Sequence, residues 1–126
     1  MEIFIATDLL NIEGEFRFNA VYAFKSKTSV KSYEKYLKST GENHKLIVTP
    51  AAVSDLDHSL EVVTVFDISN DSTEYKSTTV LDDYDEARDL VANIKESPSS
   101  VEVHRDSVKI HSRFSPDILH CGWAEL

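Results

Sequence analysis

The hydrophobic positions of this chain follow a pattern that occurs twice with the same internal spacing. In each copy the apolar residues recur at helical intervals, and a strand-like run lies before and after them. The chain is therefore predicted to contain two consecutive strand–strand–helix–strand units, at about 1–50 and 59–114, followed by a tail at 115–126. The first set of apolar positions comprises Phe24, Val30, Tyr33 and Leu37, and the second comprises Leu81, Ala87, Leu90 and Ile94.

The first unit is bounded by residues that favour turns and helix ends. Gly14 indicates a loop between two alternating runs, Gly41 is placed as the C-terminal stop of the helix, and Pro50 is expected to end the last strand. The predicted elements are strands at 2–6, 16–24 and 44–49, a loop at 8–15 and a helix at 26–40.

The second unit begins after a polar stretch at 51–59. Turn-forming residues at 69–72 separate two strand-like runs, which predicts a hairpin. Asp83, with Glu86 three residues later, has the form of a capping box and indicates a helix that stops before Pro98. The strands of the predicted hairpin lie at 60–68 and 73–81.

The last two strand-like runs, 100–105 and 108–114, are predicted to pair through a two-residue turn at Asp106 and Ser107. Because side chains alternate along a strand, this register gives the hairpin one apolar face and one polar face. The apolar face carries Val101, Val103, Val108 and Ile110. The polar face carries Glu102, His104, Lys109, His111 and Arg113.

These elements together predict a single α+β domain over 1–126. The expected architecture is a mostly antiparallel sheet with two helices on one face, because a half-apolar helix must bury its apolar side. If the two units arose by duplication, a pseudo-twofold axis is expected to relate them.

Composition narrows the class of protein. The chain has 126 residues, a formal net charge of -9 and a single cysteine, Cys121, which cannot form an internal disulfide. With no apolar leader and no run of membrane length, we expect a cytoplasmic protein, in the host cytoplasm if a phage encodes it, that does not bind a membrane. The acidic balance disfavours direct binding to nucleic acid and favours a basic protein partner.

Charge is distributed unevenly along the chain. Residues 25–45 contain six lysines and two glutamates, whereas residues 55–89 contain eleven acidic and two basic residues. Acidic groups at the start of the second helix also interact favourably with the helix dipole, which explains some of these charges but not all of them. The predicted partner-binding residues are Asp55, Asp57, Asp67, Asp71, Glu74, Asp82, Asp83, Asp85, Glu86 and Asp89.

Candidate catalytic and metal-binding groups are few. Glu102, His104 and His111 share the polar hairpin face and could hold Zn²⁺, but an ordinary cross-strand charge pair is the stronger interpretation. His120 and Cys121 are neighbours in sequence, an arrangement that seldom directs an imidazole toward a thiol. The sequence also lacks a glycine-rich phosphate loop and a nucleophile elbow. We therefore predict a non-enzymatic protein with no catalytic residue, no metal and no cofactor.

A resemblance covers residues 15–50. The runs Glu15–Phe18, Ala23–Lys27, Tyr33–Lys38 and Lys45–Val48 are similar to the hairpin, helix and strand of small accessory proteins that are common in phages and mobile elements. The resemblance implies that the chain acts by binding and disabling a host or competitor protein. Acidic immunity proteins that neutralise toxins have a similar size and charge.

Two interpretations of function and one of assembly follow. The preferred one is an inhibitor whose acidic surface docks on a basic protein site, such as that of a nucleic-acid enzyme or a toxin. The alternative is a pocket between the two units that binds or sequesters a nucleotide signal. A homodimer is also predicted, either through contact between the basic and the acidic helix or through apolar tail residues. The nucleotide pocket would use Arg17, Tyr22, Arg105 and Arg113, and the tail interface would use Ile118, Leu119 and Trp123.

Overall fold

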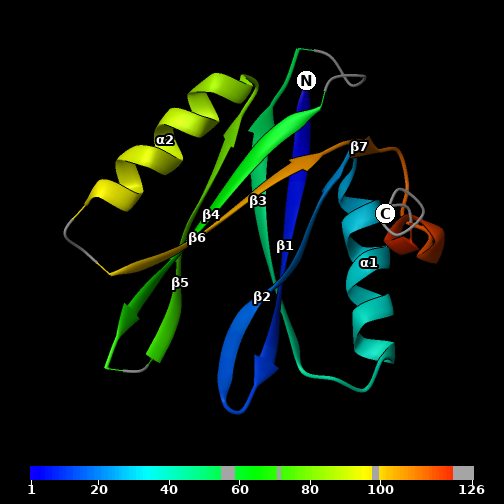
Figure 1. Ribbon diagram of the computed structural model, residues 1–126. Helices are drawn as coiled ribbons and strands as arrows, with labels where there is room; N and C mark the ends of the chain where they lie inside the picture. The colour runs from blue at the N-terminus through cyan, green and yellow to red at the C-terminus, as the bar shows by residue number, and fades with distance from the viewer. Residues whose placement is uncertain (55–58, 71, 98–99, 121–126) are drawn as a thin grey trace.

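The computed structural model describes residues 1–54, 59–70, 72–97 and 100–120. Within these residues it confirms the predicted α+β class, with two helices and seven mostly antiparallel strands (Figure 1). In chain order the elements are β1 (Glu2–Ile12), β2 (Glu15–Phe24), α1 (Lys27–Ser39), β3 (His44–Ala52), β4 (Leu60–Ser69), β5 (Ser72–Leu81), α2 (Tyr84–Glu96), β6 (Val101–Val108), β7 (Ile110–His111) and a short 3₁₀ helix (Pro116–His120).

The described strands form two sheets. One sheet has the order β3–β1–β2–β7, and the other has the order β5–β4–β6. β1 is antiparallel to β2 and β3, β4 is antiparallel to β5 and β6, and β7 pairs in parallel with β2. Each predicted unit thus contributes three strands to its own sheet, with its first strand in the middle. That the two units arose by duplication remains a prediction.

The described elements are stacked in four layers. The two sheets pack face to face through an apolar layer that includes Ile3 and Ile5 of β1 and Leu60 and Val62 of β4. The helix α1 covers the outer face of the first sheet, and α2 covers the outer face of the second (Figure 1). The helices therefore lie on opposite sides of the molecule, each against its own sheet.

The second helix begins at the predicted cap, Asp83, and the first begins after Ser26, the first residue of the predicted helix. The Ser26 hydroxyl accepts a hydrogen bond from the Ser29 amide, and the Asp83 carboxylate accepts hydrogen bonds from the Asp85 and Glu86 amides. The two predicted apolar sets pack between helix and sheet as expected. Phe24, Val30, Tyr33 and Leu37 share one cluster, and Leu81, Ala87, Leu90 and Ile94 share the other.

The first hairpin is longer than predicted. β1 runs through most of the expected loop at 8–15 as far as Ile12, which leaves a turn of two residues, Glu13 and Gly14. Both turn residues have positive φ, at 53° and 92°, as in the type I′ turns that fit the twist of a β-hairpin. β3 also extends beyond its predicted end, through Pro50. This strand lies at a sheet edge, where the missing N–H of proline needs no partner.

The predicted hairpin at 100–114 is wrong. Asp106 and Ser107 lie inside the continuous strand β6, opposite Val62 and Glu61 of β4, and β7 joins the other sheet. Side-chain alternation therefore separates the four residues of the predicted apolar face. Val101 and Val103 pack with α2, whereas Val108 and Ile110 pack between the sheets. The reason is that sheet-on-helix and sheet-on-sheet contacts bury both faces of this sheet, so its apolar pattern does not define one face.

Candidate functional site

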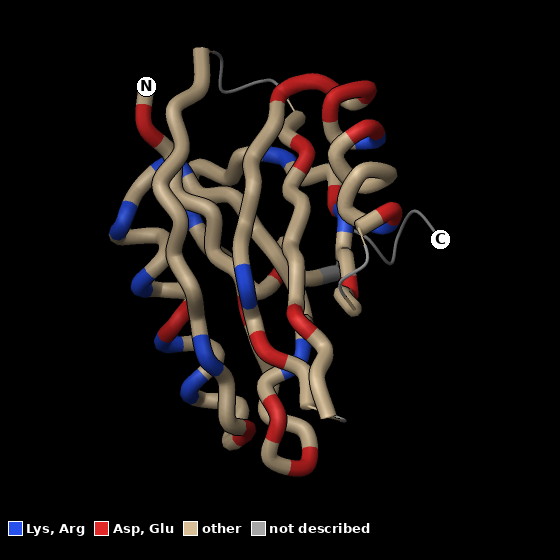
Figure 2. Tube along the Cα trace, turned by 90° about the vertical axis from the view of Figure 1, so that its left-hand side faces the viewer, with Lys and Arg blue, Asp and Glu red and all other residues tan. Residues whose placement is uncertain are grey.

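Charge is segregated onto opposite sides of the molecule. The outward surface of α1 carries exposed lysines, and the start of α2 carries exposed carboxylates, with two sheets between them (Figure 2). We name the residues Asp82, Asp83, Asp85, Glu86 and Asp89 the acidic face. Residues three and four apart in a helix are neighbours on its surface, so the carboxylates of Asp85, Glu86 and Asp89 lie close together, and Asp82 and Asp83 directly precede the helix.

Some residues of the acidic face also form contacts within α2. Asp83 caps the helix, and Arg88 lies between Asp85 and Asp89, with nitrogen–oxygen distances of 3.4 and 3.5 Å. These two ion pairs are exposed, so solvent and salt screen them strongly. Arg88 partly neutralises the negative charge of Asp85 and Asp89. The side chains of these two residues are nevertheless 70% exposed, so they stay open to solvent.

The remaining predicted partner-binding residues do not join this face. Asp67 and Glu74 are paired across β4 and β5 near their turn, at the other end of β5 from α2, and Asp67 lies 3.6 Å from the Lys76 ammonium. Asp55, Asp57 and Asp71 lie outside the described residues. The structure thus brings five of the ten predicted residues together.

The remaining acidic residue of the 55–89 segment, Glu61, is buried rather than exposed. Its Oε1 accepts hydrogen bonds from Nε and one terminal nitrogen of Arg105, at 3.0 and 2.9 Å, and its Oε2 accepts one from Ser107. Arg105 also stacks on the Tyr84 ring at 4.1 Å from its centroid, and its hydrogen bond to Glu61 raises its pKa. This network connects the first residue of α2 to the underlying sheet, which fixes where the acidic face begins.

The predicted tail interface is partly internal. Ile118 and Leu119 pack against the cluster formed by α1 and its sheet, next to Phe114. Trp123 and Cys121 lie outside the described residues. The apolar surface of Ile118 and Leu119 therefore has a partner within the same chain, and the homodimer remains a prediction without support from these two residues.

A cleft opens between the sheets at the end formed by the β1–β2 hairpin. Its volume is about 500 Å³, and its walls include Arg17 and Phe18 of β2 and Glu102 and His104 of β6. Arg17 donates a hydrogen bond to Glu102 Oε1 at 3.2 Å, and the Phe18 ring stacks on His104 at a centroid distance of 4.3 Å. The cleft lies between the two units, where a ligand pocket was expected, and Arg17 is the one residue of the four expected there that lines it.

Neither group of residues considered for zinc or nucleotide binding comes together as predicted. His111 lies on β7 beside Phe24, whereas Glu102 and His104 belong to the other sheet. The pKa of His111 is lowered by its burial and by the positive charge of Lys109. Among the described residues, no cluster of three or more His, Cys, Asp or Glu side chains could hold a metal ion. Of the four residues expected to bind a nucleotide, Arg17 lines the cleft, Tyr22 packs on Tyr33 beneath α1, Arg105 lies beneath α2, and Arg113 is exposed.

A buried Asp8–His44 pair was missed by the sequence interpretation. Asp8 is 0% exposed and accepts hydrogen bonds from Asn19 Nδ2 at 2.7 Å and His44 Nδ1 at 2.8 Å. The other ring nitrogen, His44 Nε2, lies 3.7 Å from a carboxylate oxygen of Glu42. No sequence signal joins Asp8 and His44, because they are 36 positions apart and the pairing of β1 with β3 brings them together.

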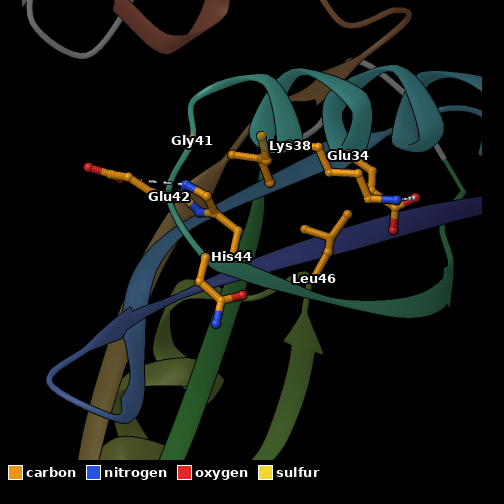
Figure 3. A pocket seen from close by; sticks show the side chains of 8 residues that line it. Glu34, Lys38, Gly41, Glu42, His44 and Leu46 are labelled. Atoms are coloured by element: carbon orange, nitrogen blue, oxygen red, sulfur yellow. Dashed lines mark ion pairs between the residues drawn. The ribbon is translucent and has the colours of Figure 1, made fainter.

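His44 of this pair lines a pocket of about 330 Å³ at the C-terminal end of α1 (Figure 3). The pocket walls include Glu34, Lys38 and Glu42, and the described side chains that line it carry no hydroxyl or thiol group. The pair connects two neighbouring strands, because Asp8 lies on β1 and His44 is the first residue of β3.

Comparisons with models of known protein families, with curated proteins and with solved structures found no match. In the described part of the chain, neither helix is long and apolar enough to span a lipid bilayer.

Proposed function

We propose that this chain is a non-enzymatic binding protein that inhibits or neutralises a protein partner. In this proposal the acidic face docks on a basic surface of the partner, of the kind that nucleic-acid enzymes and some toxins use to hold phosphate groups. The resemblance of residues 15–50 to small accessory proteins of phages and mobile elements suggests the same kind of role.

The observation that carries the proposal is the segregation of charge. Exposed carboxylates follow one side of α2, while the exposed lysines of α1 lie on the opposite outer face (Figure 2). A basic partner is attracted to one side of such a molecule and repelled by the other, which orients the encounter. The formal net charge of -9 adds attraction toward basic partners in general.

The proposal is tested by neutralising the acidic face and measuring partner binding. The variant carries Asp82→Asn, Asp85→Asn, Glu86→Gln and Asp89→Asn, and it keeps Asp83 because that residue caps α2. Partners captured from a lysate of the cells in which the protein occurs are identified, purified and assayed for binding at low and moderate salt. We expect the association rate constant of the variant to be lower by about tenfold or more, since electrostatic steering accelerates association by about 10- to 1,000-fold.

The matched control neutralises the basic helix instead, with Lys27, Lys31, Lys35 and Lys38 each changed to Gln. This control keeps the number of altered charges equal and should leave partner binding intact. Inhibition is measured directly as loss of the partner's activity on its nucleic-acid or other substrate. The proposal is wrong if no partner is captured, if the acidic-face variant binds as well as the natural chain, or if bound partner stays fully active.

A further inference from the structure

The cleft between the sheets is lined by more negative than positive charge. Its walls include the carboxylates of Glu13, Glu15 and Glu102, together with Arg17 and His104. The Arg17 guanidinium lies 3.2 Å from Glu102 and 4.0 Å from Glu15. Arg17 therefore already faces two carboxylates, and the three carboxylates of the lining outnumber its basic side chains, Arg17 and His104.

Two polar atoms at the wall lack a hydrogen bond. Among the described residues, neither Glu102 Oε2 nor His104 Nε2 has a hydrogen-bond partner, although the two atoms lie 3.5 Å apart. Glu102 and His104 line the cleft with side chains that are 28% and 30% exposed, whereas these two atoms themselves are buried. Buried polar atoms are normally paired, and each exception calls for a ligand, a water or a functional reason.

The layer behind the cleft contains further unpaired polar groups. Thr64 lies directly opposite His104 in the β4–β6 pairing, so both side chains project toward the first sheet. Thr7, on the inward side of β1, and Thr64 are both 0% exposed, and within the described chain neither hydroxyl has a hydrogen-bond partner. Asp106, two residues beyond His104 on the same side of β6, is partly buried, and this burial raises its pKa. The inter-sheet layer thus contains polar groups beside its apolar side chains.

Ile12 and the rings of Phe18 and His104 form the remaining wall of the cleft, and the buried Phe66 lies behind it. His104 stacks on Phe18 with an interplanar angle of 14°, and its edge contacts Phe66 at a centroid distance of 5.7 Å. Carboxylates beside aromatic rings form an environment that binds organic cations, because the ring faces and the carboxylates both attract positive charge. An anion would instead face the uncompensated carboxylates, which opposes the nucleotide that was expected between the units.

We propose that this inter-sheet cleft binds a small organic cation through an ammonium or guanidinium group. Glu13 at the mouth and Glu102, through the oxygen that also accepts from Arg17, receive the cationic group, and the Phe18–His104 stack contacts its aliphatic part. The site is separate from the acidic face and does not rest on the proposed protein–protein function.

The test uses spermidine and agmatine as cationic probes and ATP as an anionic probe. Binding to the full chain is measured by calorimetry at about 0.15 M salt, where exposed charges are screened beyond about 8 Å. We expect an amine to bind, ATP not to bind, and Glu102→Gln to weaken amine binding about tenfold. Glu13→Gln changes an exposed turn residue that does not support the fold, and it should weaken binding in the same direction.

The matched control is the double variant Asp85→Asn with Glu86→Gln, which removes two carboxylates from the acidic face. It should bind the amine as tightly as the natural chain does, and amide chemical shifts should change around Phe18 and His104. Absence of amine binding overturns the proposal. Preference for ATP, or loss of amine binding in the acidic-face control with no effect of Glu102→Gln and Glu13→Gln, overturns it as well. Failure of partner docking through α2 would not affect any of these outcomes.

Discussion

Removing the Asp8 carboxylate should destabilise the fold more than any exposed acidic substitution. Asp8 is fully buried and accepts two short hydrogen bonds, from Asn19 and His44. Asn19 is the extra residue of a β-bulge, because Asp8 pairs with Ala20 while Leu9 pairs with Phe18. A bulge redirects a side chain out of its regular alternation, and here it brings the Asn19 amide to Asp8.

The expected magnitude follows from these two contacts. A hydrogen bond to a charged group contributes about 1.5–3 kcal/mol to stability, so Asp8→Ala should lose about 3 kcal/mol or more. Total stabilities of folded domains are about 5–15 kcal/mol, so this loss is a large fraction of the whole. With a urea dependence of about 1–3 kcal/mol per molar, the unfolding midpoint should fall by about 1 M or more.

The assay is equilibrium unfolding in urea, followed by far-ultraviolet circular dichroism. Asp67→Ala is the matched control, because its exposed carboxylate lies 3.6 Å from Lys76 and should contribute less than about 1 kcal/mol. A double-mutant cycle with His44→Ala should show coupling, since each single change removes the same hydrogen bond. The reasoning is refuted if Asp8→Ala and Asp67→Ala lower the midpoint equally.

Three further predictions concern stability. Asp83→Ala should cost about 1 kcal/mol by removing the cap of α2, while Asp83→Asn should cost much less, and urea midpoints distinguish the two. Gly14→Ala should cost about 1 kcal/mol although no atom lies within 4 Å of the added Cβ, because φ is +92°; an unchanged midpoint would contradict the turn geometry. Asp106→Asn should raise the melting temperature at neutral pH. Burial raises the pKa of Asp106, so the natural chain loses stability as pH rises through that pKa, and the gain should vanish below about pH 3.9.

The local elements were predictable because their signals lie within a few residues of one another. The caps at Ser26 and Asp83 and the two apolar sets depend on helical geometry alone. The hairpin of β4 and β5 likewise follows from a turn-rich segment between two alternating runs. These signals predicted the α+β class without any knowledge of tertiary contacts.

The division into two sheets was not predictable from the same pattern. Val103 and Val108 face opposite sides of one strand, and both sides are buried, so the sequence shows apolar residues that a hairpin would explain equally well. The deciding fact is that Lys109 connects β6 of one sheet to β7 of the other, and this depends on contacts distant in sequence. The same limitation hid most of the residues that line the inter-sheet cleft, whose walls include parts of β2 and β6.

The candidate site divides in a similar way. The acidic face was found from sequence because its members lie within eight consecutive residues, at the start of one helix and directly before it. The Asp8–His44 pair and the Arg17–Glu102 contact were missed, because strand pairing and sheet stacking bring these residues together across long stretches of chain. The number of charged residues could thus be read from the sequence, but their positions in space depend on the fold.

The positions of the two charged helices also restrict how copies of this chain could associate. A closed dimer with twofold symmetry uses the same surface on both copies, whereas contact between α1 of one copy and α2 of the next uses two different surfaces. Because these surfaces lie on opposite sides of the molecule, repeated contact would extend into an open chain of copies (Figure 2). The homodimer predicted from sequence must therefore use another surface, and Lys31→Glu with Lys35→Glu should leave its mass in light scattering unchanged. A dimer that this charge reversal dissociates would contradict the argument.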